Sequence, residues 1–188
     1  MNNLVFFLEE TSARGMLKGL LPRLLPDSIS PTYVVFEGKQ DLEKRLPRKL
    51  RSWLDPRADF IVLRDKDGAD CKAVKQNLRK ICTDAGKPET VIRIACTELE
   101  SWYLGDLQAV ESAFAINGLA KMQNKKKFRN PDNLANAAEE MKKITNKKYQ
   151  KISGSRAMGP KLGINDNQSG SFNVFLRSID SIKTRMEL

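Results

Sequence analysis

The chain has 188 residues, of which 40% are hydrophobic and 30% are charged, so it can bury a core as one domain or as one domain with a modest appendage. It contains no histidine, which excludes Ser-His-Asp and Cys-His catalysis, histidine-ligated metals and a histidine general base. The three cysteines, Cys71, Cys82 and Cys96, lack CxxC spacing, so neither a disulfide framework nor a cysteine zinc site is expected.

The first 105 residues alternate between strand and helix signals. Short, mostly apolar runs predict four buried strands, at residues 4–8, 33–36, 60–63 and 90–95. Helices are expected between them, at about residues 12–25, 40–54 and 72–85. Pro22 and Pro47 predict a kink or an early end in the first two helices, and Gly86 is a C-cap signal for the third. Short apolar strands separated by helices indicate a parallel α/β sheet that is covered on both faces.

The strand signal disappears after residue 106. Short helices are expected in the remainder, at residues 107–114, 132–144 and 171–182. The sequence therefore predicts an α/β core of about four parallel strands over residues 1–106. A basic, mainly helical part over residues 107–188 is expected to pack on this core.

The net charge of +10 is concentrated in one segment. Residues 121–161 hold 12 basic and 3 acidic side chains, whereas residues 1–120 are nearly balanced, with 18 basic and 17 acidic. Such a segment favours a polyanionic partner, most simply nucleic acid, and a solvated lysine-rich surface is the alternative. The candidate nucleic-acid-binding residues are Lys125, Lys126, Lys127, Arg129, Lys147, Lys148, Lys151 and Arg156.

The sequence carries no membrane or export signal of the ordinary kind. No apolar run approaches the roughly 18 residues of a membrane span. The start, MNNLVFFLEETSARG, lacks the basic region and long apolar stretch of a signal peptide. We therefore expect a cytoplasmic protein without membrane association.

Acidic residues follow each predicted strand, at the edge where functional groups of a parallel α/β sheet collect. They are Glu9 and Glu10, then Glu37, then Asp65, Asp67 and Asp70, and finally Glu98 and Glu100. If the first, third and fourth strands are neighbours, four or more carboxylates meet there and repel one another unless a cation neutralises them. Oxygen ligands without histidine or cysteine select Mg²⁺, Mn²⁺ or Ca²⁺. The alternative explanation, a helix cap or first-turn acid, is favoured for Glu37 and Asp70 taken alone.

This pattern resembles the Toprim (topoisomerase–primase) domain, whose signature is a glutamate after the first strand and a DxD motif after the third. Here these are Glu9 in FFLEETSAR and Asp65 and Asp67 in FIVLRDKDGAD. Within Toprim the chain is most similar to small bacterial proteins related to OLD-type (overcoming lysogenisation defect) nucleases. That similarity rests on LEETSARGMLKGLLPRLLP, FEGKQDLEKRLPRKLRSW, FIVLRDKDGADC, RIACTELESWYLGD and YQKISGSRAMGP. Such proteins are often encoded beside ABC- or AAA-type ATPases and are linked to phage defence.

The resemblance implies a Mg²⁺- or Mn²⁺-dependent nuclease acting on DNA or tRNA, with a partner ATPase. The ELE element at Glu98–Leu99–Glu100 resembles the extra acidic motif of the OLD branch, which helps to hold metal. The catalytic residues would be Glu9, Asp65, Asp67 and Lys151. Lys151 is the best match for a positively charged residue that assists catalysis in that branch, and Arg156 is the second match. Toprim domains commonly begin with Glu-Gly followed by Asp, whereas Glu10 and Ala13 stand at those places here, so Glu9 and Glu10 both remain candidate ligands.

The residues alone leave two other functions open. An acidic pair after the first strand and an aspartate after the third also describe the pocket of a receiver-like phospho-acceptor module. The chain could also serve as a non-catalytic nucleic-acid-binding subunit of an ATPase complex. Whether one or two metal ions bind, and whether the protein forms a homo-oligomer, are not decided by the sequence.

Overall fold

The structure is a computed structural model and describes residues 1–187. Its centre is a sheet of four parallel strands, arranged in the order β2-β1-β3-β4. The strands are β1 (Asn2–Leu8), β2 (Ile29–Val35), β3 (Ala58–Asp65) and β4 (Val91–Ala95). The prediction of a parallel α/β fold with about four strands is confirmed. Because β1, β3 and β4 are neighbours, the acidic segments that follow them end at the same edge.

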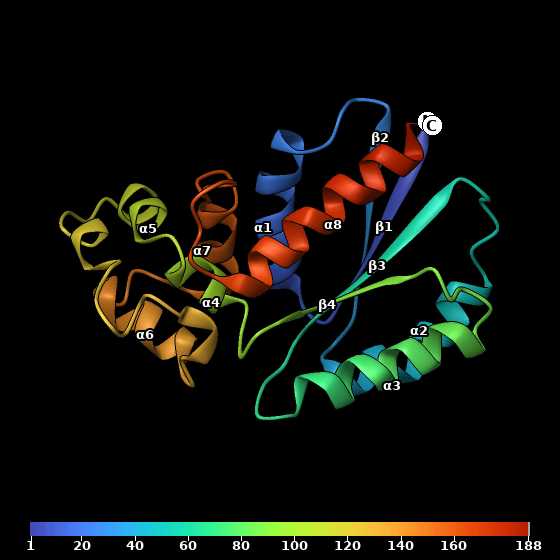
Figure 1. Cartoon of the computed structure of the whole chain (residues 1–188), viewed down its shortest axis with the longest axis horizontal. Helices are drawn as coiled ribbons and strands as arrows, with labels where there is room; N and C mark the ends of the chain where they lie inside the picture. The colour runs from blue at the N-terminus through green and yellow to red at the C-terminus, as the bar shows by residue number, and fades with distance from the viewer. Residues whose placement is uncertain (188) are drawn as a thin grey trace.

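Helices cover both faces of the sheet (Figure 1). One face carries α2 (Lys39–Arg51) and α3 (Cys71–Asp84), and the other carries α1 (Thr11–Leu20) and α8 (Gly170–Met186). Alternate strand residues point to opposite faces. Phe6 of β1 therefore joins the core under α1 and α8, whereas Phe7 joins a second core with Leu46 of α2 and Leu78 of α3. This arrangement explains why the strands are apolar at successive positions.

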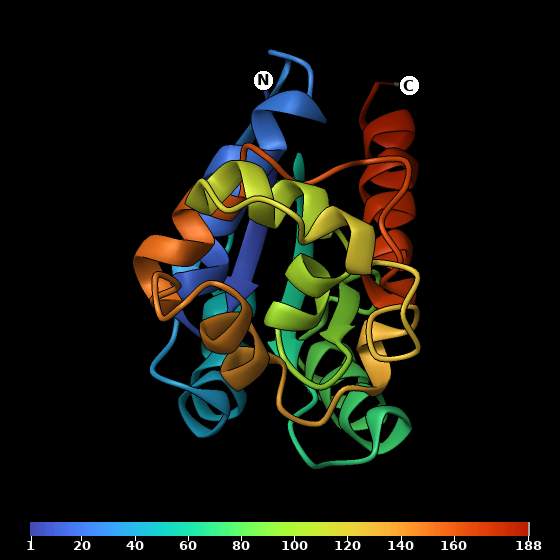
Figure 2. The ribbon, with the colours of Figure 1, turned by 90° about the vertical axis from the view of Figure 1, so that its left-hand side faces the viewer.

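The remaining helices form a layer beyond the carboxyl edge of the sheet, which Figure 2 shows in front of the strands. They are α4 (Glu100–Leu104), α5 (Leu107–Phe114), α6 (Ala137–Ile144) and α7 (Lys151–Met158), with the short 3-10 turns η2 (Ala120–Met122) and η3 (Pro131–Asn133). We call this group of elements the helical layer. A further 3-10 turn, η1 (Leu21–Arg23), follows α1 and is not part of this layer. The layer lies where a parallel sheet presents its functional groups.

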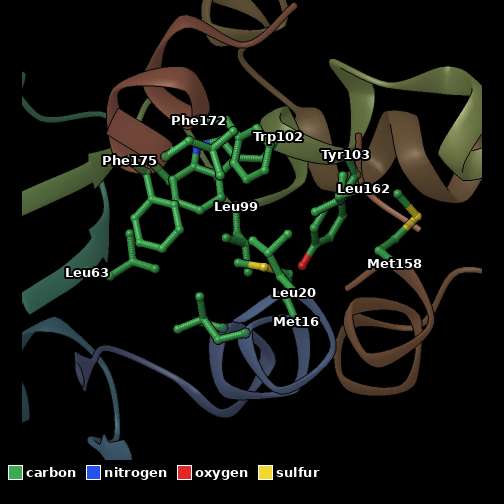
Figure 3. Packing of buried hydrophobic residues seen from close by; sticks show 14 of the residues in the cluster. Met16, Leu20, Leu63, Leu99, Trp102, Tyr103, Met158, Leu162, Phe172 and Phe175 are labelled. Carbon is green, nitrogen blue, oxygen red and sulfur yellow. The ribbon is translucent and has the colours of Figure 1, made fainter. Parts of the chain in front are cut away.

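The helical layer shares the hydrophobic core of the α1 and α8 face. Trp102 and Tyr103 of α4 are fully buried at the junction, and the Trp102 ring lies 5.1 Å from the ring centroids of Phe172 and Phe175 in α8. Figure 3 shows these rings together, with the Tyr103 hydroxyl directed towards α1. One continuous hydrophobic core joins the sheet, α8 and the helical layer. The helical layer is therefore held in a fixed position over the acidic edge of the sheet.

The observed helices differ from the predicted ones in several places, among them α6, which begins at Ala137 rather than at residue 132. Helix α1 ends at Leu20 and continues only as the 3-10 turn around Pro22, as the proline indicated. Helix α2 runs unbroken through Pro47, with Leu46 and Leu50 buried in the core on that face of the sheet. Helices α4 and α7 were not predicted from the sequence.

Among residues 1–187, no helix is both long enough and apolar enough to cross a membrane.

Candidate active site

Backbone hydrogen bonds continue past the ends of the strands and fix the acidic segments side by side. The Glu9 N–H donates to the Leu63 carbonyl at 3.2 Å, so β1 stays paired with β3 beyond its last residue. The Asp67 N–H donates to the Thr97 carbonyl at 2.9 Å, which ties the loop after β3 to the loop after β4. The three acidic segments are therefore held by the main chain rather than by side chains alone.

Glu10 forms the contact between the sheet edge and the helical layer. Its Oε2 accepts a hydrogen bond from Lys151 Nζ at 2.7 Å, while its Oε1 is buried without a hydrogen-bond partner. Lys151 is the first residue of α7, and about half of its side chain is exposed. Partial burial lowers the pKa of Lys151, but the bond to Glu10 and the charges of Glu100 and Asp65 outweigh this effect and raise it. The lysine is thus held in its charged form.

Asp65, the last residue of β3, lies among these groups. Burial raises the pKa of its carboxyl well above the usual range. The negative charges of Glu10, Glu100 and Glu9 raise this pKa further, while Lys151 lowers it. Four carboxyl groups from three chain segments are therefore close enough to act on one another's pKa.

Glu100 is buried at the start of α4. Its Oε1 accepts a hydrogen bond of 2.6 Å from the Tyr149 hydroxyl, which comes from the loop before α7. Burial raises the pKa of the Glu100 carboxyl, and the bond from Tyr149 offsets part of that rise. The Tyr149 ring packs so closely on Gly154 that a Cβ there would collide with it. Gly154 therefore sets the position of the hydroxyl that orients Glu100.

Glu9 and Glu10 point to opposite sides of the sheet edge. Glu9 Oε2 accepts the Asp65 N–H at 3.1 Å and lies 3.8 Å from Arg64 Nε. Arg64 is buried and also donates to Glu43 Oε1 on α2 at 2.6 Å. Burial raises the pKa of Glu9, and both the backbone bond and Arg64 lower it. Successive residues of an extended segment point to opposite sides, so Glu10 faces Lys151 and Glu9 faces Arg64.

One acid of the DxD pair and one of the ELE pair, Asp67 and Glu98, have their partners away from Asp65. Asp67 has a positive φ of 52°, and its Oδ2 lies 3.2 Å from Lys39 Nζ with the aspartate side chain 42% exposed. Its charge still contributes to raising the pKa of Glu9. Glu98 Oε2 accepts the Ala138 N–H at 2.7 Å, so this side chain satisfies the amino end of α6. The structure therefore places Glu100, rather than Glu98, beside Asp65.

Several buried polar atoms at this edge have no hydrogen-bond partner. They are Glu10 Oε1, Ser12 Oγ, Ser101 Oγ and Tyr103 Oη. All four come from the first residues around α1 and from α4, the two segments that flank Asp65. Buried polar groups are almost always paired in folded proteins, with protein atoms, water or ions. The site therefore contains several polar atoms that a ligand, an ion or water could still contact.

The donor set fits a hard divalent cation, since every candidate ligand is a carboxylate and one buried carboxylate oxygen has no partner. Glu10, Asp65 and Glu100 would hold it, with Glu9 and Asp67 at the rim. In the described part of the chain, no three acidic or thiol side chains already stand close enough to ligate one ion. Binding would thus require these carboxylates to turn towards a common point.

The predicted basic residues do not lie in one group. Lys151 and Arg156 belong to α7, next to the acidic edge. Lys127 instead pairs with Glu140 at 2.6 Å, and Lys148 Nζ donates to the Phe114 carbonyl. Figures 1 and 2 both show residues 120–130 (yellow) apart from α7 (orange). The remaining predicted residues, all exposed, are Lys125, Lys126, Arg129 and Lys147.

Sequence reasoning missed several side chains of the site. A signal existed for Arg64, a charged residue that directly follows the apolar run FIVL at a strand end. No local signal marks Tyr149, Tyr103, Ser12 or Ser101, because their roles depend on contacts between distant segments.

The fold and the site define a parallel α/β protein with an acidic, oxygen-donor edge under a helical layer that contributes a lysine. The chain belongs to the family described as "Domain of unknown function (DUF4276)", whose model matches residues 8–180 and so includes every candidate site residue. No curated protein and no solved structure matches the chain.

Proposed function

We propose that the protein is a divalent-metal-dependent phosphodiesterase that hydrolyses nucleic acid. The observation that carries this proposal is the 2.7 Å contact between Lys151 Nζ and Glu10 Oε2, next to Asp65 and Glu100, whose carboxyl pKa values this lysine lowers. Carboxylates this close are costly in the absence of additional positive charge. Because these carboxylates meet at the functional edge of a parallel sheet, the site favours a bound cation. The resemblance to Toprim nucleases agrees with this proposal.

A divalent cation bound here would supply Lewis acidity to a phosphate oxygen and would lower the pKa of a water molecule near the phosphorus. The protein contains no histidine to serve as a general base, and burial raises the pKa of Asp65 and Glu100. Each of these carboxyls therefore binds a proton more readily than an exposed one, and a bound cation would favour its ionised form.

The chain's own residues have separable roles in this proposal. Lys151 reaches the site with a charged ammonium that would neutralise charge accumulating on the phosphate oxygens. Tyr149 orients Glu100 through its hydroxyl, and Arg64 holds Glu9 against the end of β3. Tyr149 and Arg64 are thus positioning residues.

The test is cleavage of plasmid DNA, single-stranded DNA and total tRNA with Mg²⁺ or Mn²⁺, by wild type, Asp65→Asn and Glu37→Gln. Glu37 is an exposed acid after β2, so its variant controls for the removal of one negative charge at the same edge. We expect Asp65→Asn to lose cleavage by about a hundredfold or more and Glu37→Gln to retain it. Equal cleavage by all three would contradict the proposal.

Metal binding supplies a readout that does not depend on activity or on a partner. Titration calorimetry with Mn²⁺ is expected to detect binding by wild type and Glu37→Gln but not by Asp65→Asn. The resemblance supports adding a neighbouring ATPase when the protein alone does not cleave. Phosphate transferred to Asp65 from a small phosphodonor, without metal-dependent cleavage, would favour a receiver-like module instead.

A further inference from the structure

Helices α1 and α7 run side by side with both amino ends at the acidic edge. The ends meet through the bond between Lys151 and Glu10, the residue before α1. Further along, Gly15 lies against the backbone of Ile152 and Arg156, and a Cβ at Gly19 would stand 2.5 Å from Pro160 Cδ. The two helices are therefore parallel and packed backbone to backbone over about two turns.

A groove follows the seam between these helices. Its lining residues are Thr11, Arg14, Gly15, Lys18, Gly19, Ile152, Arg156 and Pro160. Arg14 and Lys18 are four positions apart and so occupy one face of α1. Both side chains are exposed, as is that of Arg156 on the facing helix. The groove therefore receives cationic side chains from both helices.

The cations of this groove are not used by the fold. Within residues 1–187, no carboxylate lies within ion-pair distance of Arg14, Lys18 or Arg156. Two lysines of the helical layer, Lys127 and Lys142, do pair with glutamates of α6. Three cationic side chains without an acidic partner along one seam would attract a polyanion.

The groove leads to the acidic site. A second hollow, lined by Gln150, Lys151, Ile152, Ser153 and Arg156, adjoins it and shares Ile152 and Arg156 with it. Lys151 belongs to that hollow and contacts Glu10 at 2.7 Å. A chain of positive groups thus runs from Lys18 to the carboxylates, with both helix amino ends directed towards the site.

We propose that the groove between α1 and α7 binds the phosphate backbone of the nucleic-acid strand next to the phosphodiester at the acidic site. Arg14, Lys18 and Arg156 contact successive phosphates, and Ile152, which is 52% exposed, offers an apolar surface to a sugar or base. Arg14 and Lys18 lie outside the basic segment 121–161, so this binding path differs from the one that charge counting predicts. The inference rests on the proposed function and specifies how its substrate is held.

The test measures binding of a fluorescent 20-nucleotide single strand, a matching duplex and a tRNA in EDTA, where no divalent cation supports hydrolysis. The groove variant is Arg14→Glu/Lys18→Glu. Its matched control is Lys75→Glu/Arg79→Glu on α3, with the same residue types, spacing, exposure and charge change on the opposite face of the sheet. Circular dichroism and thermal unfolding verify that both variants are folded.

We expect the groove variant to bind at least one of the three probes tenfold or more weakly than wild type. For the single strand, the slope of log K against log salt should become shallower by about 1.4, as two lost phosphate contacts predict. The control should stay within threefold of wild type. Equal weakening by the control, unchanged binding by the groove variant, or no binding by wild type at 50 mM salt would overturn the inference.

The outcome separates this inference from the proposed function. Binding that depends on the groove without any metal-dependent cleavage would leave the inference standing and count against the nuclease. Cleavage that Asp65→Asn abolishes and that the groove variant retains at wild-type kcat/KM would support the nuclease and count against the inference.

Discussion

Lys151 Nζ lies 2.7 Å from Glu10 Oε2, and this contact joins the first residue of α7 to the residue before α1. It is the point at which the helical layer closes over the sheet edge. The ammonium group lies near Asp65 and Glu100 as well, since its charge acts on the pKa of both carboxyls. One cation beside three acidic side chains leaves part of their mutual repulsion unopposed, and the first predictions follow from that imbalance.

Lys151→Met should impair catalysis more than it impairs folding. The side chain is half exposed, so its loss costs little packing, whereas the phosphate would lose its neutralising partner. We expect kcat/KM for nucleic-acid cleavage to fall by about a hundredfold or more, with partial rescue in Lys151→Arg. Steady-state cleavage measures this effect, and the exposed Lys161 supplies the control variant Lys161→Met. An equal loss in both methionine variants would show that general charge, not position, matters.

Asp65→Asn should stabilise the metal-free protein at pH 8. Because the folded-state pKa of Asp65 is raised above its ordinary value of 3.8, the folded state binds more protons than the unfolded chain as the pH rises above that value. The stabilising contribution is therefore complete below pH 3.8 and is lost as the pH rises through the folded-state pKa. Asparagine removes that loss together with the repulsion from Glu10.

Thermal unfolding in EDTA at pH 5 and pH 8 measures this difference. We expect the midpoint of Asp65→Asn to exceed that of wild type by about 2–4 °C at pH 8, or about 1 kcal/mol, with a smaller gain at pH 5. Asp27→Asn, at an exposed position, should change the midpoint little at either pH. A lower midpoint for Asp65→Asn at pH 8 would refute the repulsion argument.

Tyr149→Phe and Tyr103→Phe form a matched pair that isolates one hydrogen bond. Both rings are buried, but the Tyr149 hydroxyl donates to Glu100, whereas the Tyr103 hydroxyl has no partner. Removing the donor leaves a buried carboxylate poorly satisfied, so Tyr149→Phe should lower the free energy of unfolding by about 1–3 kcal/mol at pH 8. Tyr103→Phe should be neutral or slightly stabilising. Urea unfolding of both variants gives the comparison, and equal losses would contradict the assigned role of Tyr149.

The sheet and its acidic edge could be predicted from the sequence, because both depend on local patterns. Four apolar runs specify strands, and the acids after them reach one edge whenever the strands are parallel. The choice between Glu9 and Glu10 could not be predicted, since it depends on which face of the sheet receives α7. Helix α7 itself has a weak signal, because Ser153, Gly154 and Ser155 are poor helix formers. It forms by packing on α1, which a local pattern does not report.

The same packing gives the last prediction, on Gly19. A Cβ at this position would stand 2.5 Å from Pro160 Cδ and 2.7 Å from the Pro160 nitrogen, so alanine would force α1 and the end of α7 apart. We expect Gly19→Ala to lower the free energy of unfolding by about 2 kcal/mol or more, despite the better helix propensity of alanine. Gly68→Ala is the control, because nothing lies within 4 Å of its Cβ and its φ is not positive. Chemical unfolding of the two variants measures the difference. If the groove depends on this close approach, Gly19→Ala should also weaken nucleic-acid binding under conditions where the variant remains folded. Wild-type binding by folded Gly19→Ala would show that the close packing of α1 and α7 contributes to stability alone.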